Sequence, residues 1–113
     1  MAAGKYNFTI EQGTTFSRTF TWKDNSNNPI NLTGYTAKLE IKDFKGNLLE
    51  TLTSGSGITL GGSSGTIAVS IAAVVTTTFT FDSARYDLKM TDASGNVTRL
   101  LEGVVVLDPE VTQ

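Results

Sequence analysis

The last third of the chain alternates apolar and polar side chains with a period of two, and this pattern constrains the fold more than any other feature. Tyr86, Leu88 and Met90 would share one face of a strand, with acidic, basic and hydroxyl side chains between them. A second strand-like run follows Gly95, which supplies the positive φ that a short hairpin loop requires. The pattern therefore predicts two antiparallel strands folded about residues 92–96, and an all-β chain.

The same period recurs along the rest of the chain, in segments separated by turn residues. The predicted strands cover residues 6–10, 16–22, 37–42, 48–53, 58–60 and 67–71. Strands at this spacing are typical of a sandwich, so we predict a single antiparallel, immunoglobulin-like β-sandwich of about seven to nine short strands. The side chains expected in the core between its two sheets are Phe20, Trp22, Leu39, Ile41, Val69, Leu88 and Val105.

One segment, residues 72–79, breaks the alternation with an apolar stretch that runs into three threonines. Ser70 precedes this stretch and has the side chain of a helix N-cap. The β-branched threonines disfavour a long helix. We therefore predict a short helical crossover near residues 72–79.

Two loops share the pattern Asp-x-x-Gly-Asn, at residues 43–47 and 92–96, although their flanking sequences differ. In such a turn the aspartate accepts hydrogen bonds from the backbone and the glycine takes the left-handed conformation, so one turn chemistry is used twice. Residues 24–28, Asp-Asn-Ser-Asn-Asn, hold enough oxygens to contact a calcium ion. They lack the central glycine and terminal glutamate of an EF-hand loop, so we expect this loop to cap its own turn and bind no metal.

Composition limits the chemistry available to this 113-residue chain, whose length suits one domain. It contains neither histidine nor cysteine, which excludes a Ser-His-Asp triad, thiolate catalysis and disulfides. The formal charge of -2 disfavours binding to a nucleic-acid backbone. A hydrolase would depend on paired carboxylates, for which Asp82 with Asp87 and Glu40 with Glu50 are the candidate pairs.

No signal peptide and no run of about 20 apolar residues is present, so we expect a chain made in the cytosol without a membrane span. Residues 1–5 are expected to form a flexible N-terminal arm. The β-sandwich domain is expected to cover residues 6–108, and residues 109–113 to form a C-terminal extension.

Residues 31–42, Asn-Leu-Thr-Gly-Tyr followed by an alternating strand, resemble the signature of small β-sandwich domains in bacteriophage virion proteins. The similarity is to the N-terminal domain of phage baseplate upper proteins, which hold receptor-binding proteins on the tail. Further segments that fit this pattern are residues 8–13, 22–24, 57–61, 85–88 and 99–112.

The resemblance implies a non-enzymatic virion structural protein without cofactors, assembled in the host cytoplasm. It would serve as a docking or adaptor module of the tail baseplate or fibre attachment. Its partners would be other virion proteins and further copies of itself, with no nucleic acid or membrane. Two alternatives stay open: a capsid decoration (cement) protein, and a carbohydrate- or receptor-binding β-sandwich. The second would use an aromatic platform, although core packing explains the same residues: Tyr6, Trp22, Tyr35 and Tyr86.

The two ends of the chain are the predicted docking segments. Pro109 cannot donate to a continuing strand ladder, so it would direct the chain out of the sandwich toward a partner. The short arm before residue 6 would become ordered only on docking. The candidate docking residues are Lys5, Leu107, Asp108, Pro109, Glu110 and Val111.

Overall fold

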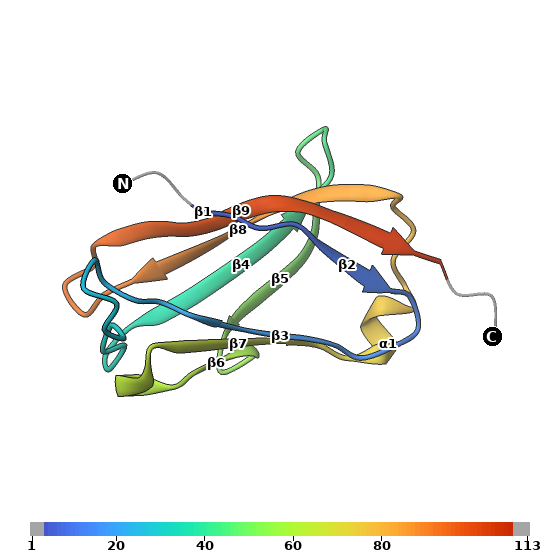
Figure 1. Cartoon of the computed structure of the whole chain (residues 1–113). Helices are drawn as coiled ribbons and strands as arrows, with labels where there is room; N and C mark the ends of the chain where they lie inside the picture. Colours follow the sequence, from blue (N-terminus) through green and yellow to red (C-terminus); the bar gives the residue numbers. More distant parts are fainter. Residues whose placement is uncertain (1–3, 110–113) are drawn as a thin grey trace.

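A computed structural model describes residues 4–109, which form mostly strands, with one short helix and one 3₁₀ turn (Figure 1). The all-β prediction is confirmed. The elements are β1 (Gly4–Lys5), β2 (Phe8–Glu11), β3 (Phe16–Thr21), β4 (Thr36–Lys42), β5 (Leu48–Ser54), β6 (Gly57–Leu60), the 3₁₀ turn (Gly62–Ser64), β7 (Thr66–Ile71), α1 (Ala73–Thr76), β8 (Ser83–Thr91) and β9 (Val97–Asp108).

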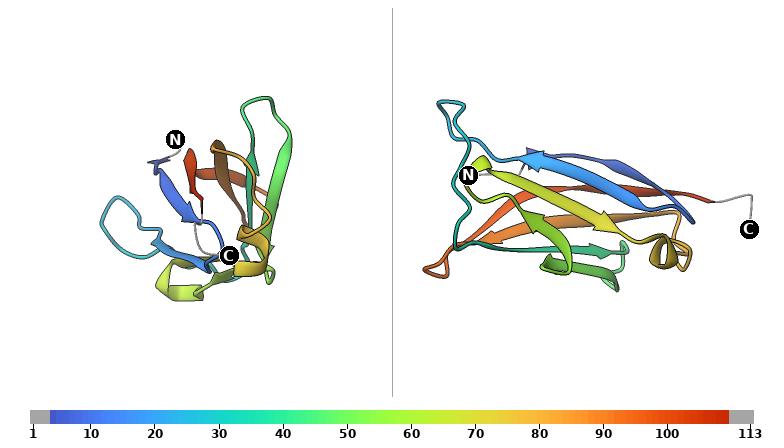
Figure 2. Two further views of the ribbon diagram at one scale, coloured as in Figure 1. Left: turned by 90° about the vertical axis from the view of Figure 1, so that its right-hand side faces the viewer. Right: turned by 90° about the horizontal axis from the view of Figure 1, so that it is seen from below.

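The strands form one curled sheet in the order β1-β9-β8-β4-β5-β6-β7-β3, with β2 also paired to β9. The curl places β9, β8 and β4 in one layer above β3, β7 and β6 (Figure 1), and Figure 2 shows the two layers facing each other end-on. The prediction of a purely antiparallel sheet is wrong, because β1 and β2 run parallel to β9 and the short β5–β6 pairing is also parallel. Alternation shows which face a residue takes, but it carries no information on the direction of the neighbouring strand.

The core lies between the two layers and consists of the alternate residues that face inward. Five of the seven expected core residues are at most 2% exposed, and Phe20 and Trp22 are partly buried at its rim. There Phe20 meets Tyr6 edge to face, with ring centroids 5.2 Å apart, and Trp22 meets Tyr35 in the same way at 5.9 Å. These contacts help to close the sides of the curl, where no strand pairing is available.

The predicted helical crossover is present as α1, although its cap differs from the expected one. Ser70 lies exposed within β7, and the N-cap is Ala72, which makes no side-chain hydrogen bond, so the Ser70 prediction is wrong. What anchors the helix is the fully buried Thr76. Its Oγ1 donates to the Thr14 carbonyl at 2.8 Å and accepts from the Gly13 N–H at 3.1 Å, which ties α1 to the turn between β2 and β3.

The Asp-x-x-Gly-Asn turns have the predicted chemistry. In each, one carboxylate oxygen of Asp43 or Asp92 accepts from the backbone N–H groups two and four residues later, and the glycine has φ near 90°. Hydrogen bonds from Asn47 to Asp43, and from Asn96 to Asp92, lower the pKa of both aspartates. The loop at residues 24–28 has the same backbone bonds, with Asn27 in the left-handed position at φ 67°. The turn is thus used three times.

The N-terminal segment is bound to β9 and β8 along its described length. Gly4 and Lys5 form β1, so this part of the expected flexible arm belongs to the sheet, and residues 1–3 lie outside the described residues. The Tyr6 N–H donates to the Glu102 carbonyl at 3.0 Å, and the Tyr6 carbonyl accepts from the Tyr86 hydroxyl at 2.6 Å. A Cβ at Gly103 would overlap this same Tyr6 carbonyl, so glycine is required for the close approach of the two segments.

Candidate functional site

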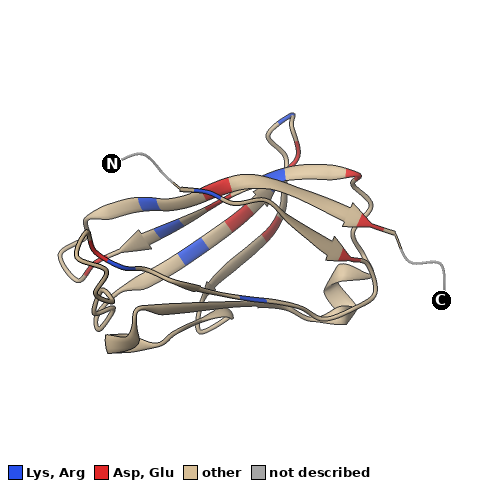
Figure 3. Cartoon of the chain, viewed as in Figure 1, with Lys and Arg blue, Asp and Glu red and all other residues tan. Residues whose placement is uncertain are grey.

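Charged residues gather along β4, β8 and β9 (Figure 3). On β4 and β8 the residues between buried core positions point away from the core, as alternation requires. The opposite layer differs sharply, because Arg18 is the one charged residue in β3, β6 and β7. We call the following set the charged face: Lys38, Glu40, Lys42, Arg85, Asp87, Lys89, Arg99 and Glu102.

The strand register arranges the charged face in rows of like charge that run across the strands. From one end of the face to the other these are the first basic row (Lys38, Lys89 and Arg99), the acidic row (Glu40, Asp87 and Glu102) and the second basic row (Lys42 and Arg85). Directly opposite residues on neighbouring antiparallel strands have Cβ atoms about 5 Å apart, and like charges at this distance destabilise a sheet. The face therefore contains like-charge pairs that are unfavourable in the isolated chain.

A β-bulge completes the rows on β9. The register shifts between Leu88, which is opposite Leu101, and Lys89, which is opposite Arg99, so Leu100 is the extra residue. Arg99 and Glu102 are three positions apart and would face opposite sides of a regular strand. With the bulge both point outward, and the guanidinium of Arg99 lies 3.0 Å from the Glu102 carboxylate.

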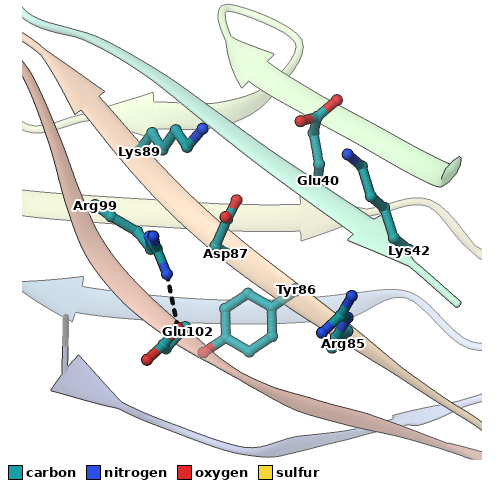
Figure 4. A pocket seen from close by; sticks show the side chains of 8 residues that line it. All are labelled: Glu40, Lys42, Arg85, Tyr86, Asp87, Lys89, Arg99 and Glu102. Carbon is teal, nitrogen blue, oxygen red and sulfur yellow. Dashed lines mark hydrogen bonds and ion pairs between the residues drawn. The ribbon is translucent and has the colours of Figure 1, made fainter. Parts of the chain in front are cut away.

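The charged face encloses a shallow hollow of about 250 Å³ (Figure 4). Glu102 lies at one side and makes a 2.8 Å ion pair with Lys5 in addition to its contact with Arg99. These two cations, Lys5 first, lower the pKa of Glu102. Asp87 lies at the centre of the acidic row and makes no ion pair within 4.0 Å among residues 4–109.

Tyr86 lies below the hollow with its ring toward the core (Figure 4). Burial is the main cause that raises its pKa, with a smaller contribution from Tyr6. The neutral hydroxyl holds the Tyr6 carbonyl, so this side chain braces the N-terminal segment against β8.

The predicted docking residues do not come together at one surface. Lys5 is bound to Glu102 at the edge of the charged face. Leu107 is buried at 7% exposure and is in parallel register with Ile10 of β2, so its side chain belongs to the core and is not exposed to a partner. β9 ends at Asp108, and the exposed Pro109 follows directly, as expected for a proline that ends a strand. Glu110 and Val111 lie outside the described residues.

The alternative sites suggested by the sequence are dispersed. Glu40 is in register with Thr51, so Glu40 and its predicted partner Glu50 face opposite sides of the sheet. In place of that pair, the register sets Glu40 beside Asp87. Of the four platform aromatics, Tyr86 is buried and the others meet neighbouring rings in separate pairs. Within residues 4–109 no three acidic side chains come close enough to hold a metal ion.

No protein-family model matches this chain, and no curated protein matches it either. The resemblance to baseplate upper proteins stays a prediction. None of the helices in the described part of the chain is long and apolar enough to cross a membrane.

Sequence reasoning missed the charged face as a site. The alternation over residues 37–42 predicts a strand, and Glu40 was considered only as a possible partner of Glu50. The signal available was that residues 85–89 repeat the same basic, acidic, basic order. An antiparallel pairing of two such segments aligns like charges whenever their acidic residues are opposite each other, as Glu40 and Asp87 are.

Proposed function

We propose that this chain is a non-enzymatic docking module of a bacteriophage particle, placed at the tail baseplate or at fibre attachment, where it binds neighbouring virion proteins. The observation that supports this proposal is the charged face, with its like-charge rows over a packed core. The resemblance at residues 31–42 supplies the virion setting and the immunoglobulin-like sandwich class, both of which belong to the proposal.

The charges favour docking for a physical reason. A row of like charges repels itself across the strands, and a partner that presents the opposite charges to the same row relieves this repulsion. Charge complementarity of this kind chiefly fixes register and partner choice, whereas the affinity of each contact stays modest. A particle that repeats the contact many times by symmetry converts modest affinity into stable attachment through high effective concentration.

Labelling of particles tests the proposal. The tagged chain is produced in cells during growth of the phage that encodes it, and heads, tails and complete particles are separated by density and probed with gold-labelled antibody. We expect label on tails, and reduced label for Asp87→Lys, at the centre of the acidic row. Thr19→Lys places a new charge on exposed β3 and serves as the control, with label at the wild-type level.

Two results would contradict the tail assignment. Label confined to heads would favour the capsid decoration protein instead. A chain that stays in the soluble fraction while particles assemble normally would remove the virion role altogether. Binding of the purified chain to immobilised glycans, lost on substitution of Trp22, would favour the carbohydrate-binding alternative.

A further inference from the structure

We propose that the charged face binds the same face of a second copy of this chain, around a two-fold axis that runs parallel to the rows. This pairing rests on the proposed docking function and names one partner for it. The axis lies between the first basic row and the acidic row. The first basic row of each copy then faces the acidic row of the other copy.

The symmetry follows from the order of charges on each strand. A rotation of 180° about an axis along the rows reverses the direction of each strand but keeps its position across the sheet. β4 of one copy therefore lies over β4 of the other, and β8 over β8. The rows are two residues apart on β4 and β8, which is about 7 Å. Stacked sheets keep their strand directions within about 30°, so the rows stay aligned over the width of three strands. The pairs formed, each made twice, are Glu40 with Lys38, Asp87 with Lys89 and Glu102 with Arg99.

Charge complementarity selects this register over its alternatives. With the axis on the acidic row, that row would face itself and the first basic row would face the second, so every contact would be repulsive. A shift that sets the acidic row against the second basic row gives Glu40 and Asp87 each a cation on the other copy. It leaves Glu102 opposite the uncharged Val104. The register that uses the first basic row is the one in which all three acidic side chains face a cation.

The contacts inside one copy leave this face able to accept a partner. Lys89, Lys42 and Arg85 make no ion pair within 4.0 Å in residues 4–109, and Asp87 likewise has none. The pair of Lys38 with Glu40 is long, at 3.9 Å. A second copy supplies opposite charges to the central residues, Asp87 and Lys89, which the fold itself has left without a counter-ion.

The size of the face predicts weak association. Three neighbouring strands of about seven residues span roughly 15 by 23 Å, so each copy would bury roughly 350 Å². The total lies at the small end of protein interfaces, below the size of a stable dimer in dilute solution. Because the contacts are between charged, solvent-exposed groups, the dissociation constant should rise steeply with salt. Such a contact is suited to a particle, where neighbours are held close together.

Charge reversal at the centre of the face tests the pairing. Sedimentation velocity of the full chain is measured from 10 µM to 1 mM in about 20 mM and about 500 mM salt. We expect the wild type to self-associate at low salt and to dissociate at high salt. Asp87→Lys and Lys89→Asp should each weaken self-association at least tenfold, because each sets like charges against each other twice. An equimolar mixture of the two variants should associate again, since both central contacts become attractive.

Lys23→Asp is the matched control, because it changes the net charge as Lys89→Asp does but lies on the exposed β3–β4 connection. It should associate like the wild type, and circular dichroism establishes that each variant is folded. The pairing is refuted if the wild type stays monomeric at low salt, if the folded mixture does not associate, or if both single variants dimerise normally. The last result would point to another surface, such as the edge strand β3. None of these results bears on particle labelling, so either proposal can fail alone.

Discussion

Replacement of Tyr86 by phenylalanine isolates one hydrogen bond that connects two distant parts of the chain. The ring of Tyr86 is buried at 4% exposure, and its hydroxyl donates to the Tyr6 carbonyl at 2.6 Å. Phenylalanine keeps the ring and its contact with Phe8, whose centroid lies 4.7 Å away. The substitution therefore removes the link between β8 and the N-terminal segment with little change in packing.

The expected decrease in the free energy of unfolding has two sources, the missing hydrogen bond and the acceptor that is left without its donor. A typical hydrogen bond contributes about 0.5–1.5 kcal/mol net, and an acceptor left without its donor adds to the loss. The hydrogen bond is part-buried, so water compensates in part and we expect a total of about 1–2 kcal/mol. For a chain of this length the unfolding entropy is about 0.24 kcal/mol/K, which converts the loss into a melting-temperature decrease of about 4–8 °C.

The pKa of Tyr86 adds a pH signature to the same variant. Burial raises the pKa of this hydroxyl above its ordinary value in the unfolded chain, which is about 10. A group whose pKa is raised by folding contributes stability below its unfolded pKa and loses it as the pH rises further. The difference in stability between wild type and Tyr86→Phe should therefore be constant from pH 6 to 9 and shrink above pH 10.

Urea unfolding monitored by tryptophan fluorescence measures both effects. Tyr35→Phe is the matched control, since the Tyr35 hydroxyl makes no hydrogen bond to residues 4–109 and the ring is only partly buried. That variant should unfold within about 0.5 kcal/mol of the wild type. A Tyr86→Phe protein as stable as the control at pH 7 would refute the view that this bond braces the N-terminal segment.

Three further substitutions test the core, the close approach of strands and the aspartate turns. Leu88→Ala should cost about 2–5 kcal/mol in urea unfolding, because Leu88 is fully buried; a loss under 1 kcal/mol would contradict its place in the core. Gly103→Ala should cost about 1–3 kcal/mol and increase hydrogen exchange at Tyr6, whose carbonyl a new Cβ would displace; unchanged exchange would argue against this contact. Folding lowers the pKa of Asp92, so its contribution is present above the unfolded pKa near 3.9 and lost as the pH falls through the folded pKa. Asp92→Asn should accordingly lose less stability than wild type between pH 5 and 2, and parallel pH profiles would count against this turn chemistry.

Most strand positions could be predicted from the sequence, because burial on one face imposes a period of two. Leu39 and Ile41 on β4, and Leu88 on β8, show this most clearly. The direction of β1 and β2 could not be predicted, since side-chain periodicity is the same for parallel and antiparallel neighbours. Leu107 was included among the docking residues for the same reason: the sequence does not show that β2 pairs beside the last strand.

The loop at residues 24–28 caps its own turn as expected, but its likeness to the two Asp-x-x-Gly-Asn turns was not predicted. Asp43 and Asp92 were recognised because glycine follows at the fourth position of each turn, where φ is positive. At residues 24–28 that position is Asn27, and asparagine is the non-glycine residue that tolerates this conformation best. A search for glycine or asparagine at this position finds all three turns.

The charged face depends on register, which no single strand encodes. If β8 were displaced by two residues, Glu40 and one of its neighbouring lysines on β4 would lie beside opposite charges, so the like-charge rows arise only from the observed pairing of Glu40 with Asp87. The buried partners Leu39 and Leu88 face each other in that same register, and they can do so only with these charges aligned outside. Core packing therefore sets the charge rows.

The bulge on β9 shows that the rows extend beyond what core packing imposes. Leu101, Val105 and the residues between them follow the regular alternation of the inner face, and continued alternation would turn Arg99 inward against Met90. The extra residue, Leu100, reverses this, so Arg99 joins Lys89 on the outside although a basic neighbour is already present there. A bulge interrupts the ladder at the place where it occurs. Within one copy the bulge gains the ion pair of Arg99 with Glu102, and an acidic surface that covers the row would offset the interrupted pairing and the added like charge further.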